Sequence, residues 1–284
     1  MSEKFTFSNP IIDILTAEDV EPDWVVPNLI AAGSMIVLGG EAGAGKSYIS
    51  YTICLAIAAG VPALSGIVPA GPCKRVLYFD EENSGQDRDK YLRRSFQGLG
   101  GLDVMDYADL LDNFLPVHFH LGGDDWIDRC AEFVDFWTPD LLVFDTATPC
   151  FNIQDENANA EATQAMKGIR HLMRMTDPVA SALVLKHAKV RVDGGRRMLR
   201  GAKAWQSGAD GVLFQVKAMG RPRNDGLNLT RLIPDKVRAY GLPQTLYITP
   251  EWMDAKRNGL KLSASYTPDK DHKKAERKDE GDDD

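Results

Sequence analysis

The ten residues GGEAGAGKSY, at positions 39–48, constrain the fold of this chain more than any other segment. They fit the pattern G-x-x-x-x-G-K-[ST] from Gly40 to Ser47, between the apolar run SMIVLGG and the helical pattern SYISYTICLAIAAG. A glycine-rich turn between a buried strand and a helix lets backbone N–H groups surround phosphates, and the helix N-terminus adds partial positive charge. The motif in this context predicts a phosphate-binding loop.

The positions within this loop predict how it would hold a nucleotide. Lys46 would reach the β- and γ-phosphates of ATP, and the Ser47 hydroxyl would hold Mg²⁺, so we expect both as cofactors. The predicted nucleotide contacts are Gly40, Glu41, Ala42, Gly43, Ala44, Gly45, Lys46, Ser47 and Tyr48. Such a loop also occurs in small-molecule kinases and GTPases, so the class depends on carboxylates elsewhere in the chain.

Short apolar runs alternate with helical patterns along most of the sequence. Runs with strand character occupy 35–39, 75–80, 117–121, 141–145 and 181–187, followed by 211–216, 227–233 and 245–249. The first five are nearly continuous apolar runs, which is typical of parallel strands covered on both faces. The last three lack long helices between them. The pattern predicts an α/β fold: a P-loop NTPase core with a mostly parallel twisted sheet, flanking helices and antiparallel C-terminal strands.

Length alone allows one or two domains, and the chain can bury one large core. The chain has 284 residues, of which 44% are hydrophobic, enough for one large core. We expect residues 1–262 to form a single ATPase domain, its first roughly 20 residues being an arm or linker. From Ser263 onward apolar residues nearly vanish and charges are dense, so residues 263–284 are predicted to be a disordered tail.

The cysteines and the N-terminal residues favour a cytoplasmic protein without membrane association. The opening MSEKFTFSNP has no apolar signal core, and no apolar run reaches the roughly 18 residues of a membrane span. The cysteines form no C-x-x-C pair and are expected to be reduced core thiols: Cys54, Cys73, Cys130 and Cys150. In VHFHL, His118 and His120 share one face of the expected strand. Without cysteine or carboxylate neighbours, an ordinary strand is favoured over a metal site.

Two apolar strands end in carboxylates that could complete a nucleotide site. Ligands bind at the carboxyl ends of parallel strands, so Asp145, which ends DLLVFD, can face the same Mg²⁺ as Ser47. The run VLYFDEEN places Asp80, Glu81 and Glu82 together, and such acids repel unless they bind a cation or a water. Hydrolysis needs a carboxylate to orient the attacking water. Strand alternation favours Glu82 over Glu81, and an acidic turn in solvent is the alternative.

Together these motifs resemble the RecA-like ATPases, and most closely the RepA-type hexameric replicative DNA helicases of plasmids and phages. The resemblance runs from DWVVPNLIAAGSMIVLGG to TLYIT, nearly the whole chain. It implies a RecA-like core, with Glu82 as the catalytic base. It also implies that His187, which ends ALVLKH, senses the γ-phosphate. A histidine at a strand end is about as often a structural hydrogen-bonding residue.

The segment PDKVRAYG matches the K-x-R element that RecA-like hexamers insert into the neighbouring subunit's site. The resemblance implies that Lys236 and Arg238 are such fingers. A cation supplied in this way stabilises charge on the transferring phosphoryl group, by ~10³–10⁵ in rate. An exposed charged turn is the alternative. Leu213 stands where some relatives carry an arginine, which makes Arg238 more important.

A cationic segment follows the strand that ends in His187. The formal net charge is −8, which argues against a protein that coats nucleic acid broadly. The run KHAKVRVDGGRRMLRGAK, at 186–203, inverts that sign locally, at the place where RecA-like proteins have a mobile DNA-binding loop. A solvated loop is the alternative. The predicted DNA contacts are Lys189, Arg191, Arg196, Arg197 and Arg200.

These features favour an ATP-dependent, ring-forming DNA helicase or translocase that acts on single-stranded DNA in plasmid or phage replication. The expected partners are single-stranded DNA, further copies of the chain in a homo-oligomer, namely a hexamer, and replication-initiation proteins. A RecA-like recombinase or remodeller that binds DNA without unwinding is one alternative. A non-catalytic, ATP-gated regulatory module is another. The sequence has no obvious extra DNA-binding domain, which favours a minimal ring.

Overall fold

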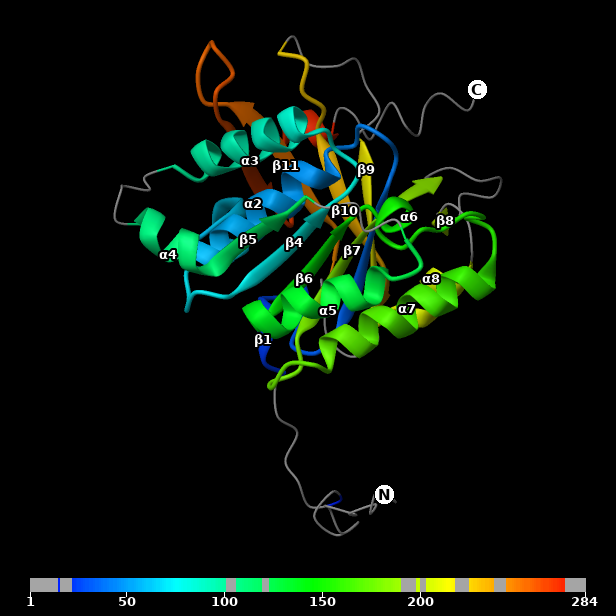
Figure 1. Cartoon of the computed structure of the whole chain (residues 1–284). Helices are drawn as coiled ribbons and strands as arrows, with labels where there is room; N and C mark the ends of the chain where they lie inside the picture. Colours follow the sequence, from blue (N-terminus) through cyan, green and yellow to red (C-terminus); the bar gives the residue numbers. More distant parts are fainter. Residues whose placement is uncertain are drawn as a thin grey trace, which may run out of the picture.

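One large sheet organises the computed structural model, which describes residues 15, 22–100, 106–118, 123–189, 198–199, 203–217, 225–237 and 244–273. Within these residues the ten-stranded sheet has the order β12-β11-β10-β9-β3-β7-β6-β4-β5, and β8 (Met198–Leu199) pairs with β7 beside this path. A separate antiparallel pair, β1 (Trp24–Val26) and β2 (Ile30–Ala31), precedes it in the chain. Figure 1 shows the sheet between two layers of helices.

The central strands of the sheet are parallel, as their continuous apolar runs predict. They are β3 (Met35–Gly40), β4 (Val76–Asp80), β5 (Phe114–Val117), β6 (Leu141–Asp145), β7 (Ser181–Lys189) and β9 (Gly211–Lys217). Every residue of β3, β4 and β6 is buried, because these strands are covered on both faces. Their carboxyl ends meet at one edge of the sheet, and that edge carries the predicted site.

Helices of opposite layers pack on alternate residues of these strands. On one face lie α2 (Lys46–Ala59), α3 (Gly85–Leu99) and α4 (Asp106–Asn113), and on the other α5 (Trp126–Trp137), α7 (Asn159–Met173) and α8 (Lys203–Gly208) (Figure 1). Two short helical segments, η1 (Leu64–Gly66) and α6 (Ala147–Cys150), lie in connections. Tyr78 and Val143 belong to the core on the α2 side, whereas Phe79 and Phe144 belong to the core on the α5 side. No helix in the described ranges has the length and apolarity that a membrane span requires.

Three antiparallel strands extend the sheet beyond β9, which confirms the antiparallel extension predicted for 227–233 and 245–249. They are β10 (Thr230–Val237), β11 (Leu246–Trp252) and β12 (Leu260–Ser265). The run at 211–216, expected among the antiparallel strands, is β9 and lies parallel to β3. The sequence analysis does not predict β12, which continues past Ser263, the expected start of the tail. Further along, His272 is 1% exposed, and its ring meets Tyr247 edge-on with centroids 5.2 Å apart. The chain is therefore packed against the sheet beyond the predicted boundary.

The strand predicted at 117–121 lies earlier in the structure, at Phe114–Val117. Its register with β4 pairs Phe114 with Val76 and Val117 with Phe79, so pairing ends where β4 ends. His118 follows the strand, and its Nδ1 lies 2.9 Å from the Asp80 carbonyl oxygen. His120 lies outside the described residues. Pro116 is compatible with this position, because β5 is at the edge of the sheet, where a missing N–H donor is tolerated.

The cysteines carry free thiols in the structure. Cys54, Cys130 and Cys150 are buried, as predicted for core thiols, whereas Cys73 is exposed. Burial is the main cause that raises the pKa of the Cys54 thiol to about 12. The buried thiols therefore stay protonated at neutral pH and act as small apolar groups of the core.

Candidate nucleotide-binding site

The predicted phosphate loop connects the central strand β3 to α2. Gly40, the last residue of β3, lies in register with His187 of β7 and with Gln215 of β9. Gly43 and Gly45 have φ angles of 66° and 89°, a region that glycine enters without the steric cost of a side chain. The loop therefore turns over the carboxyl edge of the sheet, between two parallel strands, before α2 begins.

Contacts with β9 and with Lys46 hold the loop closed. Gln215 Nε2 donates to the Ala44 carbonyl oxygen at 2.5 Å, and a Cβ atom added at Gly40 would lie 3.0 Å from the Gln215 carbonyl oxygen. Lys46 is 6% exposed, and its Nζ donates to the carbonyl oxygens of Gly40 and Glu41 at 3.1 Å each. The ammonium is thus held inside the loop, where it can meet phosphate groups.

A cavity of about 280 Å³ opens over the loop. Of the predicted nucleotide contacts, residues 43–48 line it, whereas Gly40, Glu41 and Ala42 are not part of its lining. The lining also contains Glu82 and His187. Its apolar part comes from α2, α3 and the C-terminal strands, with residues such as Tyr91, Leu227, Pro250, Leu260 and Leu262. The cavity therefore joins a polar phosphate loop to an apolar wall.

Asp145 and Asp80 end adjacent strands in register, and both are 0% exposed. Burial is the main cause that raises the pKa of Asp145 to about 7, and the Asp80 charge adds to it. The hydroxyl groups of Ser47 and Tyr78 oppose that rise. Asp145 Oδ1 is buried and has no hydrogen-bond partner.

The donor set around Asp145 fits a magnesium ion held together with a nucleotide. A carboxylate oxygen without a partner and the neighbouring Ser47 hydroxyl are hard oxygen ligands of the kind that Mg²⁺ prefers. Among the residues that the structure describes, no group of three His, Cys, Asp or Glu side chains could hold a metal ion. Mg²⁺ commonly binds through one or two protein oxygens plus phosphates and water, so two protein oxygens are sufficient here.

Glu82 and His187 are hydrogen-bonded at the cavity, with 3.3 Å between Oε1 and Nε2. The hydrogen bond with His187 is the main cause that lowers the pKa of Glu82 below its usual value, and Thr146 and Lys46 also lower it. The structure therefore brings together Glu82, His187 and Lys46, which are more than thirty positions apart in sequence.

Glu81 lies on the other side of β4 from Glu82. Burial is the main cause that raises the pKa values of Cys130 and Cys150 in the core on the α5 side, and the Glu81 charge adds to it. Glu81 is not part of the cavity lining. The backbone N–H groups of Glu81 and Glu82 both donate to the Asp145 carbonyl oxygen, at 2.8 and 3.2 Å. This placement agrees with the strand alternation that favours Glu82, and the catalytic role of Glu82 stays a prediction.

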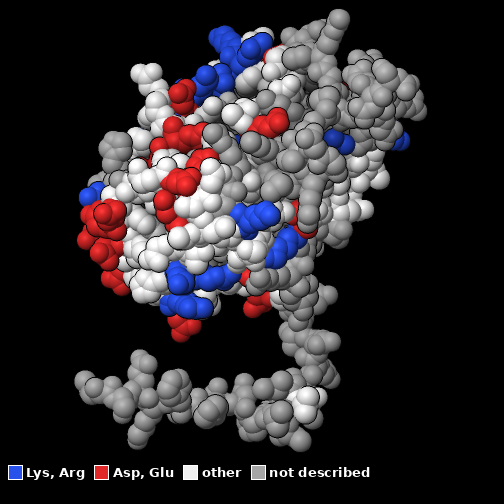
Figure 2. Space-filling view, turned by 90° about the vertical axis from the view of Figure 1, so that its right-hand side faces the viewer, with Lys and Arg blue, Asp and Glu red and all other residues white. Residues whose placement is uncertain are grey.

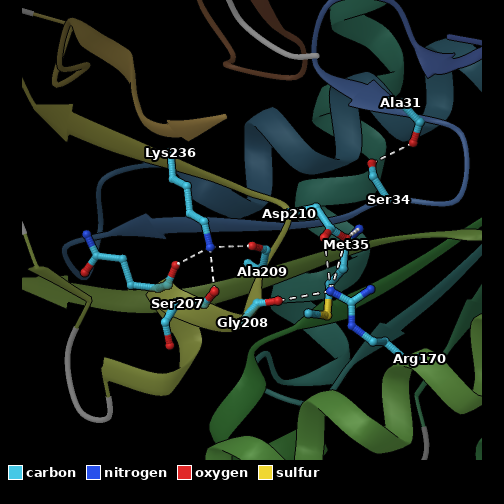
Figure 3. A network of polar contacts seen from close by, with 10 residues as sticks. Ala31, Ser34, Met35, Arg170, Ser207, Gly208, Ala209, Asp210 and Lys236 are labelled. Atoms are coloured by element: carbon cyan, nitrogen blue, oxygen red, sulfur yellow. Dashed lines mark hydrogen bonds and ion pairs between the residues drawn. The ribbon is translucent and has the colours of Figure 1, made fainter. Parts of the chain in front are cut away.

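Lys236 is engaged within its own chain. Its Nζ donates to the carbonyl oxygens of Gln206, Ser207 and Ala209 at 3.0, 2.6 and 2.8 Å, at the C-terminal end of α8 (Figure 3). A cation in this place satisfies carbonyl groups that have no partner inside the helix. These are contacts within one chain, and the role of Lys236 as a finger at a neighbouring subunit's site stays a prediction. Arg238 lies outside the described residues.

An ion pair between Arg170 and Asp210 fixes the same end of α8. Arg170 of α7 donates to the Gly208 carbonyl oxygen at 3.0 Å and to Asp210 at 3.1 Å, and Asp210 accepts the N–H of Met35 at 2.9 Å (Figure 3). Together with Lys236, these contacts attach α8 to α7, β3 and β10. Helix α8 is therefore anchored at the amino-terminal edge of the sheet, away from the phosphate loop.

Most of the predicted DNA contacts, Arg191, Arg196, Arg197 and Arg200, lie outside the described residues. Lys189 is the last residue of β7, and its side chain is not described. On both sides of 190–197 the chain is fixed, because β8 pairs antiparallel with the end of β7. Residues 190–197, the middle of the cationic segment, thus connect β7, which carries His187, to β8.

Charged side chains form separate basic and acidic areas on the side of the molecule that carries α8 and β8 in Figure 1 (Figure 2). Helices α7 and α8 pack on each other. Lys167 of α7 and Lys203 of α8 are exposed, as is Arg174 directly after α7. Of these, Lys203 begins α8 shortly after β8, so it adds positive charge near the place to which the cationic segment returns.

Sequence reasoning missed the residues that support the site. Tyr51, Tyr78 and Asn83 donate hydrogen bonds to the strand-end carboxylates, and Gln215 holds the phosphate loop. Tyr51 and Tyr78 lie inside apolar runs, where a tyrosine that only packs looks the same. The acidic strand ends were the one available signal, because buried carboxylates need donors.

The fold and this site define a P-loop NTPase. A family model described as AAA domain matches residues 2–192, more than half of the chain. The protein therefore belongs to the AAA domain family, and it is a nucleotide-dependent ATPase of the P-loop AAA/RecA-like class. The family implies nucleotide binding, usually with Mg²⁺. A search of curated proteins gives no match to the chain.

Proposed function

We propose that this protein is a ring-forming ATPase that moves on single-stranded DNA and unwinds duplex in plasmid or phage replication, as RepA-type helicases do. One observation carries the proposal: β7 bears His187, which pairs with Glu82 at the cavity, and the cationic segment starts at the end of the same strand. A change at the γ-phosphate could therefore reach the predicted DNA contacts through one strand end.

The nucleotide chemistry would use residues that meet at the cavity. Glu82 lines the cavity as an ionised carboxylate, so it would orient the attacking water and accept its proton. Lys46 would neutralise the β- and γ-phosphates, and Ser47 with Asp145 would hold Mg²⁺, which supplies charge stabilisation of the phosphoryl group. The apolar wall formed by residues such as Leu227 and Pro250 would accept the nucleoside.

The ring is proposed from the position of β10. Val237, its last residue, pairs with Gly211 at the start of β9, whereas the phosphate loop lies beside Gln215, further along the same strand. β10 thus ends at the amino-terminal ends of the parallel strands, away from the chain's own nucleotide site. Arg238 is the next residue in the sequence, and as a finger it would act on another subunit. Six copies in a closed ring would place each Arg238 at a neighbouring cavity.

The proposal is tested by measuring ATP hydrolysis with and without single-stranded DNA on protein whose mass distribution is measured by mass photometry. We expect DNA to stimulate turnover in a six-subunit species, and Lys46→Ala to abolish turnover with and without DNA. Turnover that DNA does not stimulate, in a monomer, would overturn the proposal and favour the ATP-gated regulatory module.

A further inference from the structure

Two buried tyrosines lie behind the strand-end carboxylates of the nucleotide site. Tyr78 belongs to β4, and Tyr51 lies on α2 one helical turn after Ser47. Both are 0% exposed, and their rings stack with centroids 4.3 Å apart and an angle of 8° between the planes. Burial is the main cause that raises both pKa values above the usual range, so both hydroxyl groups remain protonated donors.

Each tyrosine donates its one hydroxyl proton to a different carboxylate. Tyr78 Oη donates to Asp145 Oδ2 at 2.9 Å, and Tyr51 Oη donates to Asp80 Oδ2 at 2.7 Å. The ring stack fixes the two hydroxyl groups side by side, as Asp80 and Asp145 are side by side in the sheet. The structure therefore pairs one donor with each acid.

The two carboxylates differ in whether both of their oxygen atoms have hydrogen-bond partners. Asp80 Oδ1 accepts from the Asn83 N–H and from its side-chain amide, at 3.0 Å each, so both Asp80 oxygens have partners. Asp145 Oδ1 is buried without a hydrogen-bond partner. A buried carboxylate oxygen without a partner is costly unless a ligand meets it. Of these two acids, Asp145 is the one prepared to bind a cation.

We propose that Tyr78 is a positioning residue for the metal: by holding Asp145 Oδ2, it fixes the carboxylate so that Oδ1 is presented to Mg²⁺ beside Ser47. Tyr51 and Asn83 saturate Asp80, so that the second acid does not compete as a ligand. Without the Tyr78 hydroxyl the carboxylate group could rotate, because its terminal torsion is soft. The inference rests on the nucleotide-binding part of the proposed function and needs neither DNA nor a ring.

The test measures how much a divalent ion contributes to nucleotide affinity. Binding of ATPγS is measured by calorimetry in EDTA and in excess Mn²⁺, and the ratio of the two affinities reports the metal contact. In Tyr78→Phe the stacked ring is kept and only the hydroxyl is lost. We expect this ratio to fall roughly 10-fold or more, the size typical of residues that orient metal ligands, with the EDTA affinity unchanged.

Matched variants separate positioning from packing. Tyr51→Phe removes a hydroxyl from the same ring stack and should change the ratio much less. Asp145→Asn should abolish most of the gain in affinity that the divalent ion provides. Tyr78→p-aminophenylalanine restores a donor at the same ring position and should recover the ratio. Each ratio is taken against the variant's own EDTA value, so reduced stability does not obscure it.

Equal ratios in Tyr78→Phe and wild type would overturn the inference, as would an equal fall in EDTA affinity, which would indicate a packing role. A fall in the ratio supports it even where DNA fails to stimulate turnover. Failure of the helicase proposal and failure of this inference are thus distinguished by separate readouts.

Discussion

Glu82 and His187 meet across an intervening strand. Glu82 is the second residue after β4, His187 belongs to β7, and β6 lies between these two strands in the sheet. Their side chains nevertheless approach to 3.3 Å, over the end of β6, where the Glu82 N–H is bonded to the Asp145 carbonyl oxygen. The pair therefore links three strand ends at one cavity. The hydrogen bond with His187 is also the main cause that lowers the pKa of Glu82 below its usual value.

Glu82→Gln should retain ATP binding and lose turnover, because the amide keeps the shape of the side chain but accepts no proton. We expect kcat to fall by about 10²–10⁴-fold, the usual contribution of a general base, with little change in nucleotide affinity. Glu81→Gln is the matched control, since the Glu81 charge affects the Cys130 and Cys150 thiols on the other side of β4, away from the cavity. Loss of turnover in Glu81→Gln with normal turnover in Glu82→Gln would reverse the assignment.

The two cations of the K-x-R element should behave differently. Lys236→Ala removes the cap of α8 and should lower the free energy of unfolding by about 1–2 kcal/mol.

Arg238→Ala, mixed with wild-type protein, should reduce ATP turnover more steeply than simple dilution, as expected of a residue shared between subunits. Thermal melts and mixed-ring turnover are the two measurements. A strictly linear loss of activity with added Arg238→Ala would remove the argument for shared sites.

Replacing Arg196 and Arg197 together by alanine should weaken DNA binding through phosphate contacts. Each contact with single-stranded DNA contributes about −0.7 to the slope of log affinity against log salt, so the double variant should flatten that slope by up to ~1.4. DNA stimulation of ATP turnover should disappear while basal turnover remains. Binding titrations at several salt concentrations check this. An unchanged affinity and slope would place the DNA path elsewhere on the molecule.

The segment after β12 should contribute to stability in a pH-dependent way. Burial opposes ionisation of Asp269, but hydrogen bonds from the His272 N–H and side chain outweigh it and lower the pKa of Asp269. A lowered pKa stabilises the folded protein above the ordinary Asp value of about 3.9, and this contribution is lost as pH falls through the lowered value. Asp269→Ala should therefore lower the free energy of unfolding at pH 7 by about 1 kcal/mol or less, which appears as a lower Tm. The difference in Tm from wild type should shrink in acid.

Melts of wild type and Asp269→Ala between pH 7 and pH 3 provide this measurement. Asp271→Ala, an exposed acid in the same segment, is the control and should leave Tm nearly unchanged. A difference between wild type and Asp269→Ala that stays constant over this pH range would show that the ionised carboxylate is not responsible.

The site was predictable where a local pattern carries the chemistry. The glycine loop, Asp145 and Glu82 each stand at the end of an apolar run, and parallel strands bring such ends together. Tyr51, Tyr78 and Gln215 were not predictable, because their contacts join elements distant in sequence. The contacts of Lys236 were not predictable either, because the K-x-R motif carries no signal of its partners at the end of α8, thirty residues earlier in the chain.

The fold was predictable for strands buried on both faces and less so at the edges of the sheet. β5 lies at one edge and contains Pro116, so its apolar signal is interrupted and the prediction moved to 117–121. β12 lies at the other edge, and only Leu260 and Leu262 of the strand are buried. An edge strand needs few apolar residues, since one side has no partner strand.

Strand displacement on a forked duplex tests directly whether this protein unwinds DNA. A labelled fork with a single-stranded arm is incubated with the protein, ATP and Mg²⁺, beside Glu82→Gln and beside wild type with ATPγS. If the protein is a helicase, we expect displacement that requires both ATP turnover and an intact Glu82. Turnover that DNA stimulates, without any displacement on forks of either polarity, would contradict it and identify a DNA remodeller or recombinase instead.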